Sequence, residues 1–208
     1  MNTIGHNLKL TVYGESHGKS IGAVLDGLPS GEYLDWDEVK KEMARRAPGK
    51  NTLSTSRKEG DAFDVQSGYF NNATTGTPLA VMIENTNTRS EDYDDLRHLM
   101  RPGHADYTGK VRYDGYNDYR GGGHFSGRLT APLVFAGAVA SQILARRGIH
   151  VGSHILQIHD VQDRPFNPVH EELSLLLSLK NLTLPLLDET RTEAMEQAVA
   201  AAKSRHDS

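Results

Sequence analysis

Residues 9–25 read Lys-Leu-Thr-Val-Tyr-Gly-Glu-Ser-His-Gly-Lys-Ser-Ile-Gly-Ala-Val-Leu, and this stretch decides the fold. Residues 9–13 alternate polar and apolar side chains, which predicts a strand with one buried face. Residues 14–18 form a turn with a glycine at each end, and residues 21–25 form a second short apolar strand. The pattern predicts two strands whose connecting turn carries Ser16 and His17.

The rest of the chain mixes predicted helices and strands. A helix is expected to begin at Asp35, with Glu38 three residues further on as in a capping box, and to end at Ala47 before a Pro-Gly pair. Further elements are expected as strands at 63–69, 79–83 and 150–159, as an apolar, buried helix at 127–147 and as an amphipathic helix at 190–203. Polar residues predict loops at 50–61 and 85–119, the latter with a short helix near 92–100, and residues 173–187 are leucine-rich without a clear type.

Composition excludes several classes of protein. The 208 residues carry a net charge of −4, which argues against a general nucleic-acid binder. The absence of cysteine excludes disulfides, thiolate zinc sites and a cysteine nucleophile. The apolar stretch at 129–144 is shorter than the roughly 20 residues of a membrane helix, and the first ten residues lack the apolar run of a signal peptide. We therefore expect a cytoplasmic protein with neither nucleic-acid nor membrane partners.

Two histidines lie in glycine-bearing turns. His17 is a candidate general acid near neutral pH, and the alternative is an exposed histidine in an ordinary turn between strands. His104 lies in the loop 101–107, where Asp106 could orient its ring and Arg101 could meet an anion. The pair could also bind a metal, but neither histidine has a helical His-x-x-x-His partner. The remaining candidates, His150, His154 and His159, are interpreted as structural or surface residues.

Two further segments indicate anion binding. Residues 120–126 read Arg-Gly-Gly-Gly-His-Phe-Ser and precede the long apolar helix, where exposed N–H groups and the helix dipole favour phosphate; the alternative is a hinge. Arg45 and Arg46 at a helix end form a basic cluster with Lys50, Arg57 and Lys58. The cluster suggests a small polyanionic substrate, although cations at a helix C-terminus also serve simply as favourable charges.

Taken together, these segments resemble the chorismate synthase family. The matching segments occur in the family's order over nearly the whole chain, at 14–18, 45–49, 74–78, 85–93, 101–107 and 118–123. The resemblance implies an α+β fold, as the N-terminal part of a β-α-β sandwich with helices packed between antiparallel sheets. It also implies assembly as a homo-oligomer, a tetramer for full-length chains.

The resemblance implies a lyase reaction of the shikimate pathway to aromatic amino acids. Chorismate synthase converts 5-enolpyruvylshikimate 3-phosphate to chorismate and phosphate by a 1,4-anti elimination, with reduced FMN and no net redox change. The implied cofactor is a flavin, reduced FMN, with FAD as a related flavin term and NADPH as an optional reductant. No resident metal is expected.

The family pattern also assigns roles to residues of this chain. His17 would protonate the departing phosphate, and His104 would act as an acid toward the reduced flavin. The substrate would be bound by Ser16, Arg46, Arg57, Arg101 and Arg128. The flavin would be bound by Arg46, His124, Phe125 and Ser126.

The chain departs from the family in two respects. Family members usually read Arg-Ser-Ser-Ala-Arg-Glu-Thr where residues 124–130 stand, and only Ser126, Arg128 and Thr130 match. Family members are also much longer and continue past Asp207 and Ser208, so we expect one chorismate synthase-like domain over 1–208 that is incomplete at its C-terminus. An alternative function is therefore a catalytically incompetent fragment that folds or assembles but does not turn over.

Overall fold

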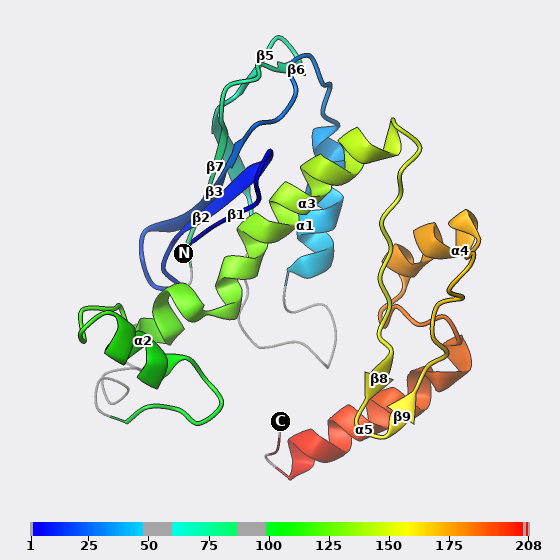
Figure 1. Cartoon of the computed structure of the whole chain (residues 1–208). Coiled ribbons are helices and arrows are strands. Elements are labelled where there is room, and N and C mark those ends of the chain that lie inside the picture. The colour runs from blue at the N-terminus through cyan, green and yellow to red at the C-terminus, as the bar shows by residue number, and fades with distance from the viewer. Residues whose placement is uncertain (1, 48–59, 87–98, 206, 208) are drawn as a thin grey trace. The chain divides into compact units, whose positions relative to one another are not determined.

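The computed structural model describes residues 2–47, 60–86, 99–205 and 207. These residues form two compact units (Figure 1). The first unit contains the described residues up to 143, and the second contains those from Leu144 onward. The expectation of a single domain stays a prediction.

An antiparallel five-stranded sheet forms the first unit's framework. Its strands are, in spatial order, β1 (Thr3–Ile4), β2 (Lys9–Gly14), β3 (Ser20–Asp26), β7 (Leu79–Glu84) and β4 (Phe63–Ser67). The strands predicted at 9–13, 21–25 and 79–83 are thereby confirmed. The strand predicted at 63–69 ends at Ser67, because Gly68 with φ +84° turns the chain into a small hairpin of β5 (Tyr69–Phe70) and β6 (Ala73–Thr74).

The core lies on one face of this sheet. Ile21, Ala23 and Leu25 alternate along β3 and are buried, and their partners across the register are Ile83, Val81 and Leu79. Two helices, α1 (Trp36–Arg46) and α3 (Thr130–Ala145), supply the other side of the same core. Figure 1 shows both helices running along the sheet.

The cap of α1 differs from the predicted capping box. The Asp35 carboxylate accepts the backbone N–H groups of Asp37 at 2.9 Å and Glu38 at 3.3 Å, as expected for an N-cap. The Asp35 N–H donates to Gln142 Oε1 at 2.7 Å and not to Glu38, and Gln142 Nε2 donates to the Asp35 carbonyl at 3.0 Å. Gln142 lies on α3, so this cap also joins the two helices.

The long apolar helix is buried as predicted, within slightly different bounds. Residues 127–129 form a 3-10 turn, η3 (Gly127–Leu129), before α3 begins, and α3 ends at Ala145. Phe135 is fully buried and packs against Trp36 and Phe63, with ring centroids 6.3 Å and 5.1 Å apart. Residues 120–145 are long and apolar enough to cross a membrane by length and composition alone, but half of the most apolar window is buried inside the structure.

The loop predicted at 85–119 contains a helix, α2 (Asp106–Arg112). Asp106 in its first turn favours the helix N-terminus, whereas Gly109 disfavours a helix interior, which is why the sequence did not predict it. A Cβ on Gly109 would stand 2.7 Å from the Phe125 ring, so a larger residue at this point of the helix would have to displace that ring. The short helix predicted near 92–100 falls mostly outside the described residues.

The second unit is small and has its own core of Leu184, Leu186 and Met195. Its elements are β8 (Gln157–Ile158), β9 (Val161–Gln162), α4 (Leu173–Ser178), η4 (Leu179–Asn181), η5 (Glu189–Arg191) and α5 (Thr192–Ser204). The helix predicted at 190–203 is confirmed. The strand predicted at 150–159 is wrong except at 157–158, because the preceding residues make only isolated backbone contacts, such as the Ile155 N–H to the Pro185 carbonyl at 2.8 Å.

Candidate active site

The turn between β2 and β3 holds its two functional side chains inside the protein. Ser16 is 0 % exposed and His17 is 9 % exposed, so the alternative of an exposed histidine in an ordinary turn is wrong. The Gly18 N–H donates to the Glu15 carbonyl at 3.0 Å and closes the turn. The Ser16 N–H donates to the Gly123 carbonyl at 3.0 Å, which attaches the turn to the run of three glycines at 121–123, the glycine run.

The glycine run receives both candidate histidines. Gly121, Gly122 and Gly123 all have positive φ, at 59°, 85° and 55°. A Cβ on Gly121 would stand 2.2 Å from two atoms of the His17 ring, and a Cβ on Gly122 would stand 2.8 Å from Cε1 of His104. Consecutive Cα atoms are about 3.8 Å apart. The two imidazoles therefore pack against neighbouring residues of one backbone segment and share one site.

The same run does not begin the long helix. It forms a 3-10 segment, η2 (Arg120–Phe125), and Ser126 then caps η3 by accepting the Arg128 N–H at 3.3 Å. The helix dipole of α3 therefore cannot supply the positive potential that was expected at the glycines. Their role in this structure is steric, because they let the histidine rings approach the backbone.

An aspartate orients His104 and holds Arg101, as the sequence indicated. Asp106 Oδ1 lies 2.6 Å from His104 Nδ1. The Arg101 guanidinium donates to both Asp106 oxygens, from Nε at 2.8 Å and from Nη2 at 3.0 Å. These hydrogen bonds from Arg101, with the nearby charges, lower the pKa of Asp106 to about 2 despite its burial. The carboxylate is therefore ionised at neutral pH and accepts a hydrogen bond from His104 Nδ1.

This pair makes stability depend on pH in acid. The pKa of Asp106 is about 2 in the folded state and 3.8 ordinarily, so the unfolded chain binds the proton first as the pH falls. The stabilisation is complete above the ordinary value and is lost as the pH falls from about 4 toward 2. We expect it to be about 1–2 kcal/mol, because Arg101 is partly exposed and solvent screens the pair.

The measurement is the free energy of unfolding against pH for the wild type and Asp106→Asn. The difference between the two proteins should be constant above about pH 5 and shrink between about pH 4 and pH 2. Asp26→Asn is the matched control, because Asp26 is exposed at the end of β3. A difference for Asp106→Asn that stayed the same down to pH 2 would contradict the prediction.

A second ion pair flanks the glycine run. Asp118 Oδ2 accepts a hydrogen bond from Arg120 Nη2 at 2.7 Å. Burial raises the pKa of Asp118, but the hydrogen bonds from Arg120 outweigh it and keep that pKa below its usual range. The charge interaction with His17 acts in the same direction on the pKa of Asp118, which connects this carboxylate electrostatically with the His17 ring.

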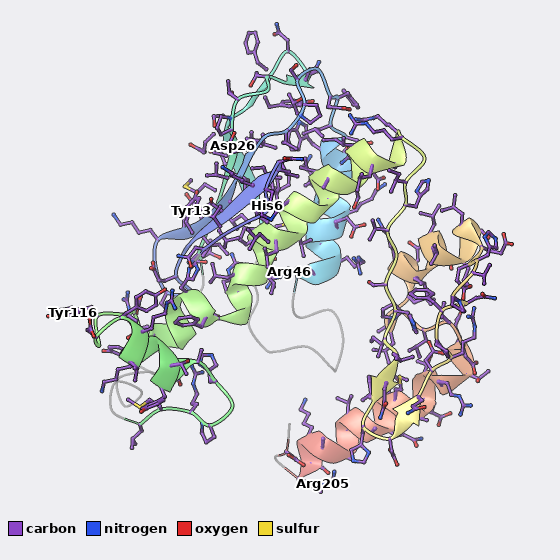
Figure 2. The ribbon with its side chains drawn as sticks, viewed as in Figure 1. His6, Tyr13, Asp26, Arg46, Tyr116 and Arg205 are labelled. Carbon is purple, nitrogen blue, oxygen red and sulfur yellow. The ribbon has the colours of Figure 1, made fainter. Side chains whose placement is uncertain are left out.

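Arg46 and Arg128 meet at one buried carboxylate. Asp61, whose side chain is 0 % exposed, pairs with Nη1 of Arg46 and with Nη1 of Arg128. Arg46 lies in the last turn of α1 (Figure 2) and also donates from Nε to the Thr130 hydroxyl at 3.2 Å. Two guanidinium groups on one carboxylate leave one positive charge in excess at this cluster. Arg57, Lys50 and Lys58 lie outside the described residues.

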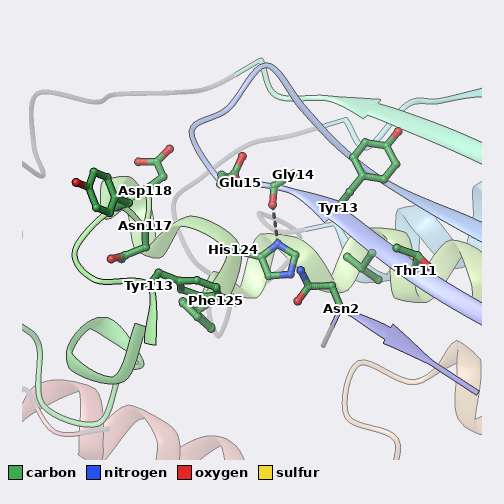
Figure 3. Close-up of a pocket in the computed structure, with 12 residues that line it drawn as sticks. Asn2, Thr11, Tyr13, Gly14, Glu15, Tyr113, Asn117, Asp118, His124 and Phe125 are labelled. Atoms are coloured by element: carbon green, nitrogen blue, oxygen red, sulfur yellow. Dashed lines mark hydrogen bonds between the residues drawn. The ribbon is translucent and has the colours of Figure 1, made fainter. Parts of the chain in front are cut away.

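A cavity of about 540 Å³ lies beside the turn and the glycine run (Figure 3). Its lining residues are Asn2, Thr11, Val12, Tyr13, Gly14, Glu15, Tyr113, Tyr116, Asn117, Asp118, His124 and Phe125. His124 Nδ1 donates to the Gly14 carbonyl at 2.8 Å, the bond drawn in Figure 3. The cavity therefore combines aromatic rings with a few polar groups, and its volume is typical of a small-molecule site.

The structure thus places the predicted residues in three neighbouring groups of the first unit. Ser16, His17, Arg101 and His104 surround the glycine run, His124 and Phe125 line the cavity, and Arg46 and Arg128 share Asp61. Sequence reasoning missed Asp61 and the contacts of Asn85, described below. Asn85 belongs to a segment that matched the family, and that match was its only signal; Asp61 had none.

Two further histidines each lie beside an aspartate. His154 is buried beside Asp163, with Nδ1 at 3.1 Å from the carboxylate, and His159 is exposed beside Asp160. Within the part of the chain that the structure describes, no three histidine, aspartate or glutamate side chains gather as a metal site.

Comparison with known proteins identifies the family. The family profile described as chorismate synthase matches residues 8–208. The chain belongs to the chorismate synthase family. Chorismate synthase of Sulfurimonas denitrificans is 41 % identical over 208 residues, and that of Thermococcus kodakarensis is 43 % identical over 204 residues. They are covered over 56 % and 55 % of their own length, and this chain over 100 % and 98 %.

A solved structure agrees with the sequence relatives. A chain titled "Crystal Structure of Chorismate Synthase" matches with a TM-score of 0.67 and 26 % identity, over 96 % of this chain and 54 % of that one. The α+β fold predicted from the family resemblance is thereby confirmed. The chain spans about half the length of the curated chorismate synthases that it matches.

Proposed function

We propose that this chain acts as a chorismate synthase, a lyase that eliminates phosphate from 5-enolpyruvylshikimate 3-phosphate to give chorismate. The observation that carries the proposal is the packing of His17 and His104 against consecutive glycines, with Arg101 in contact with His104. Paired acids beside a cation suit a reaction in which an anionic group departs and needs a proton. The family membership supports the name of the enzyme, and the reaction and its substrate are part of this proposal.

His17 donates the proton that the departing phosphate takes up. Its buried position keeps water away from the transfer, and the Asp118 carboxylate interacts with it electrostatically. His104 is the second acid; Asp106 orients its ring through Nδ1, and Arg101 Nη2 lies 3.4 Å from its Nε2. The family assigns that second acid to the reduced flavin.

The substrate carries two carboxylate groups and one phosphate group. Because all three are negatively charged, its binding needs cations. The excess positive charge of Arg46 and Arg128 at Asp61 supports a role for both in attracting it. Ser16 is next to His17, and Arg101 is next to His104, which supports a role for both in binding substrate at the acids. Arg57 is retained in this group from the family pattern alone.

The residues beside the cavity fit a flavin ring. Phe125 and Tyr113, whose centroids are 6.3 Å apart, offer flat apolar surfaces, and His124 and Asn117 offer polar edges. His124 and Phe125 would hold the ring, and Arg46 and Ser126 are further candidates from the family pattern. Reduced FMN held by these residues would supply electron density to the substrate. NADPH as its reductant, a homotetrameric assembly and a cytoplasmic location belong to the same proposal.

The test is product formation by the purified chain. We expect the chain to release phosphate and form chorismate when it is mixed anaerobically with 5-enolpyruvylshikimate 3-phosphate and chemically reduced FMN. Chromatography measures chorismate, and oxidised FMN serves as the negative control. If a folded chain bound the substrate in calorimetry without forming product, the alternative of an incompetent fragment would replace the proposal. If the chain did neither, the assignment of the substrate would be wrong as well.

A further inference from the structure

The Asn85 side chain bridges the turn that carries His17. Asn85 follows β7 directly, and its Nδ2 donates to the Glu15 carbonyl at 3.0 Å and to the Gly18 carbonyl at 2.9 Å. Those two carbonyls flank Ser16 and His17. The Asn85 N–H also donates to the Lys19 carbonyl at 3.2 Å. An amide NH₂ group has two donors, and Asn85 uses both on this turn.

Asn85 is itself oriented by a buried arginine. Its Oδ1 accepts a hydrogen bond from Arg128 Nε at 3.0 Å, so the amide oxygen faces Arg128 and the amide nitrogen faces the turn. Arg128 is 4 % exposed, and it also donates from Nη2 to the Glu84 carbonyl at 3.3 Å and pairs with Asp61. A series of contacts therefore runs from Asp61 through Arg128 and Asn85 to the turn.

The turn has little freedom to move without moving the His17 ring. Gly121 faces the ring so closely that a Cβ there would stand 2.2 Å from it. The Ser16 N–H is bound to the Gly123 carbonyl on the same side. A change in the backbone at residues 15–18 is therefore expected to change where the ring sits against the glycine run.

We propose that Asn85 is a positioning residue for His17, which acts through the turn backbone and not by touching the substrate. The inference rests on the proposed function only in giving His17 a catalytic role. The position of the ring can be measured without turnover. This separates a failure of the inference from a failure of the proposed function.

The experiment compares Asn85→Ala and Asn85→Asp with the wild type by NMR of the histidine rings. His17→Ala identifies the His17 signal by its loss. Asn85→Asp keeps an acceptor for Arg128 and nearly the same shape. Its second carboxylate oxygen, however, replaces the NH₂ donor and would face the carbonyl oxygens of Glu15 and Gly18. Asn7→Asp makes the same chemical change at an exposed turn and is the matched control.

We expect the His17 ring signals to shift or split in both Asn85 variants and to coincide with the wild type in Asn7→Asp. Where turnover is measurable, kcat should fall by about 10–10²-fold with KM changed less than about threefold, because a small misplacement of a catalytic group has that effect. Asn85→Asp keeps the inference testable if Asn85→Ala fails to fold. Unchanged His17 signals in a folded Asn85→Asp protein would overturn the inference, whatever the activity.

Discussion

Replacing His17 by alanine is expected to lower the rate of chorismate formation by about 10²–10⁴-fold, the usual contribution of a general acid. The ring is 9 % exposed and packs against Gly121, so water cannot readily replace it as the proton donor. Alanine keeps the turn's backbone bonds, from Ser16 to Gly123 and from Gly18 to Glu15. The loss should therefore fall on the reaction and leave the fold intact.

The measurement is the steady-state rate with reduced FMN, together with a thermal unfolding curve for each protein. His6→Ala is the matched control, because His6 is an exposed histidine of the same unit. A folded His17→Ala protein with a rate within a few-fold of the wild type would reject the assigned role and would make His104 the better candidate for the acid.

Replacing Gly121 by alanine is expected to be nearly as damaging, although it removes no reactive group. The added Cβ would stand 2.2 Å from Nδ1 and Cε1 of His17 and 3.1 Å from the Ser16 hydroxyl. The backbone there has φ +59°, a region that costs an L-residue roughly 1–2 kcal/mol. The His17 ring must move, so we expect turnover to fall by about 10²-fold or more and the free energy of unfolding to fall by about 1–3 kcal/mol.

Gly127→Ala gives this prediction a close control. Gly127 follows the same segment, but a Cβ there meets nothing within 4 Å and its φ is not positive. We expect it to change the free energy of unfolding by no more than about 0.5 kcal/mol and to leave turnover unaltered. Equal kinetic effects of the two substitutions would show that the contact between Gly121 and His17 does not matter.

The local elements of this fold could be predicted because their signals lie within short stretches. The alternation in β2 and β3 is visible in seven or fewer residues, and Asp35 caps α1 through N–H groups two and three residues away. Helix α2 was not predicted because Gly109 disfavours a helix interior. The Phe125 ring that packs against Gly109 comes from another segment of the chain.

The candidate site was predicted in its parts and not in its arrangement. Both histidines and the glycine run were singled out, and Asp106 was expected to orient His104, four of the features the structure brings together. The run was expected to bind phosphate at a helix start. Its positive φ angles and the 3-10 segment η2 show instead a backbone on which the histidine rings pack.

By itself, then, the sequence determined the strands β2, β3 and β7, the helices α1, α3 and α5, the family and the candidate reactive side chains, because local periodicity and motif order carry that information. Only the tertiary structure decided which groups meet. Asn85 and the Glu15 carbonyl are 70 residues apart in the chain, and Arg128 and Asp61 are 67 apart. An asparagine in a polar loop has the same local pattern whether its amide bridges a turn or faces water. Its role follows from the path of the chain, since hydrogen bonds form between groups that are near in space and not in sequence.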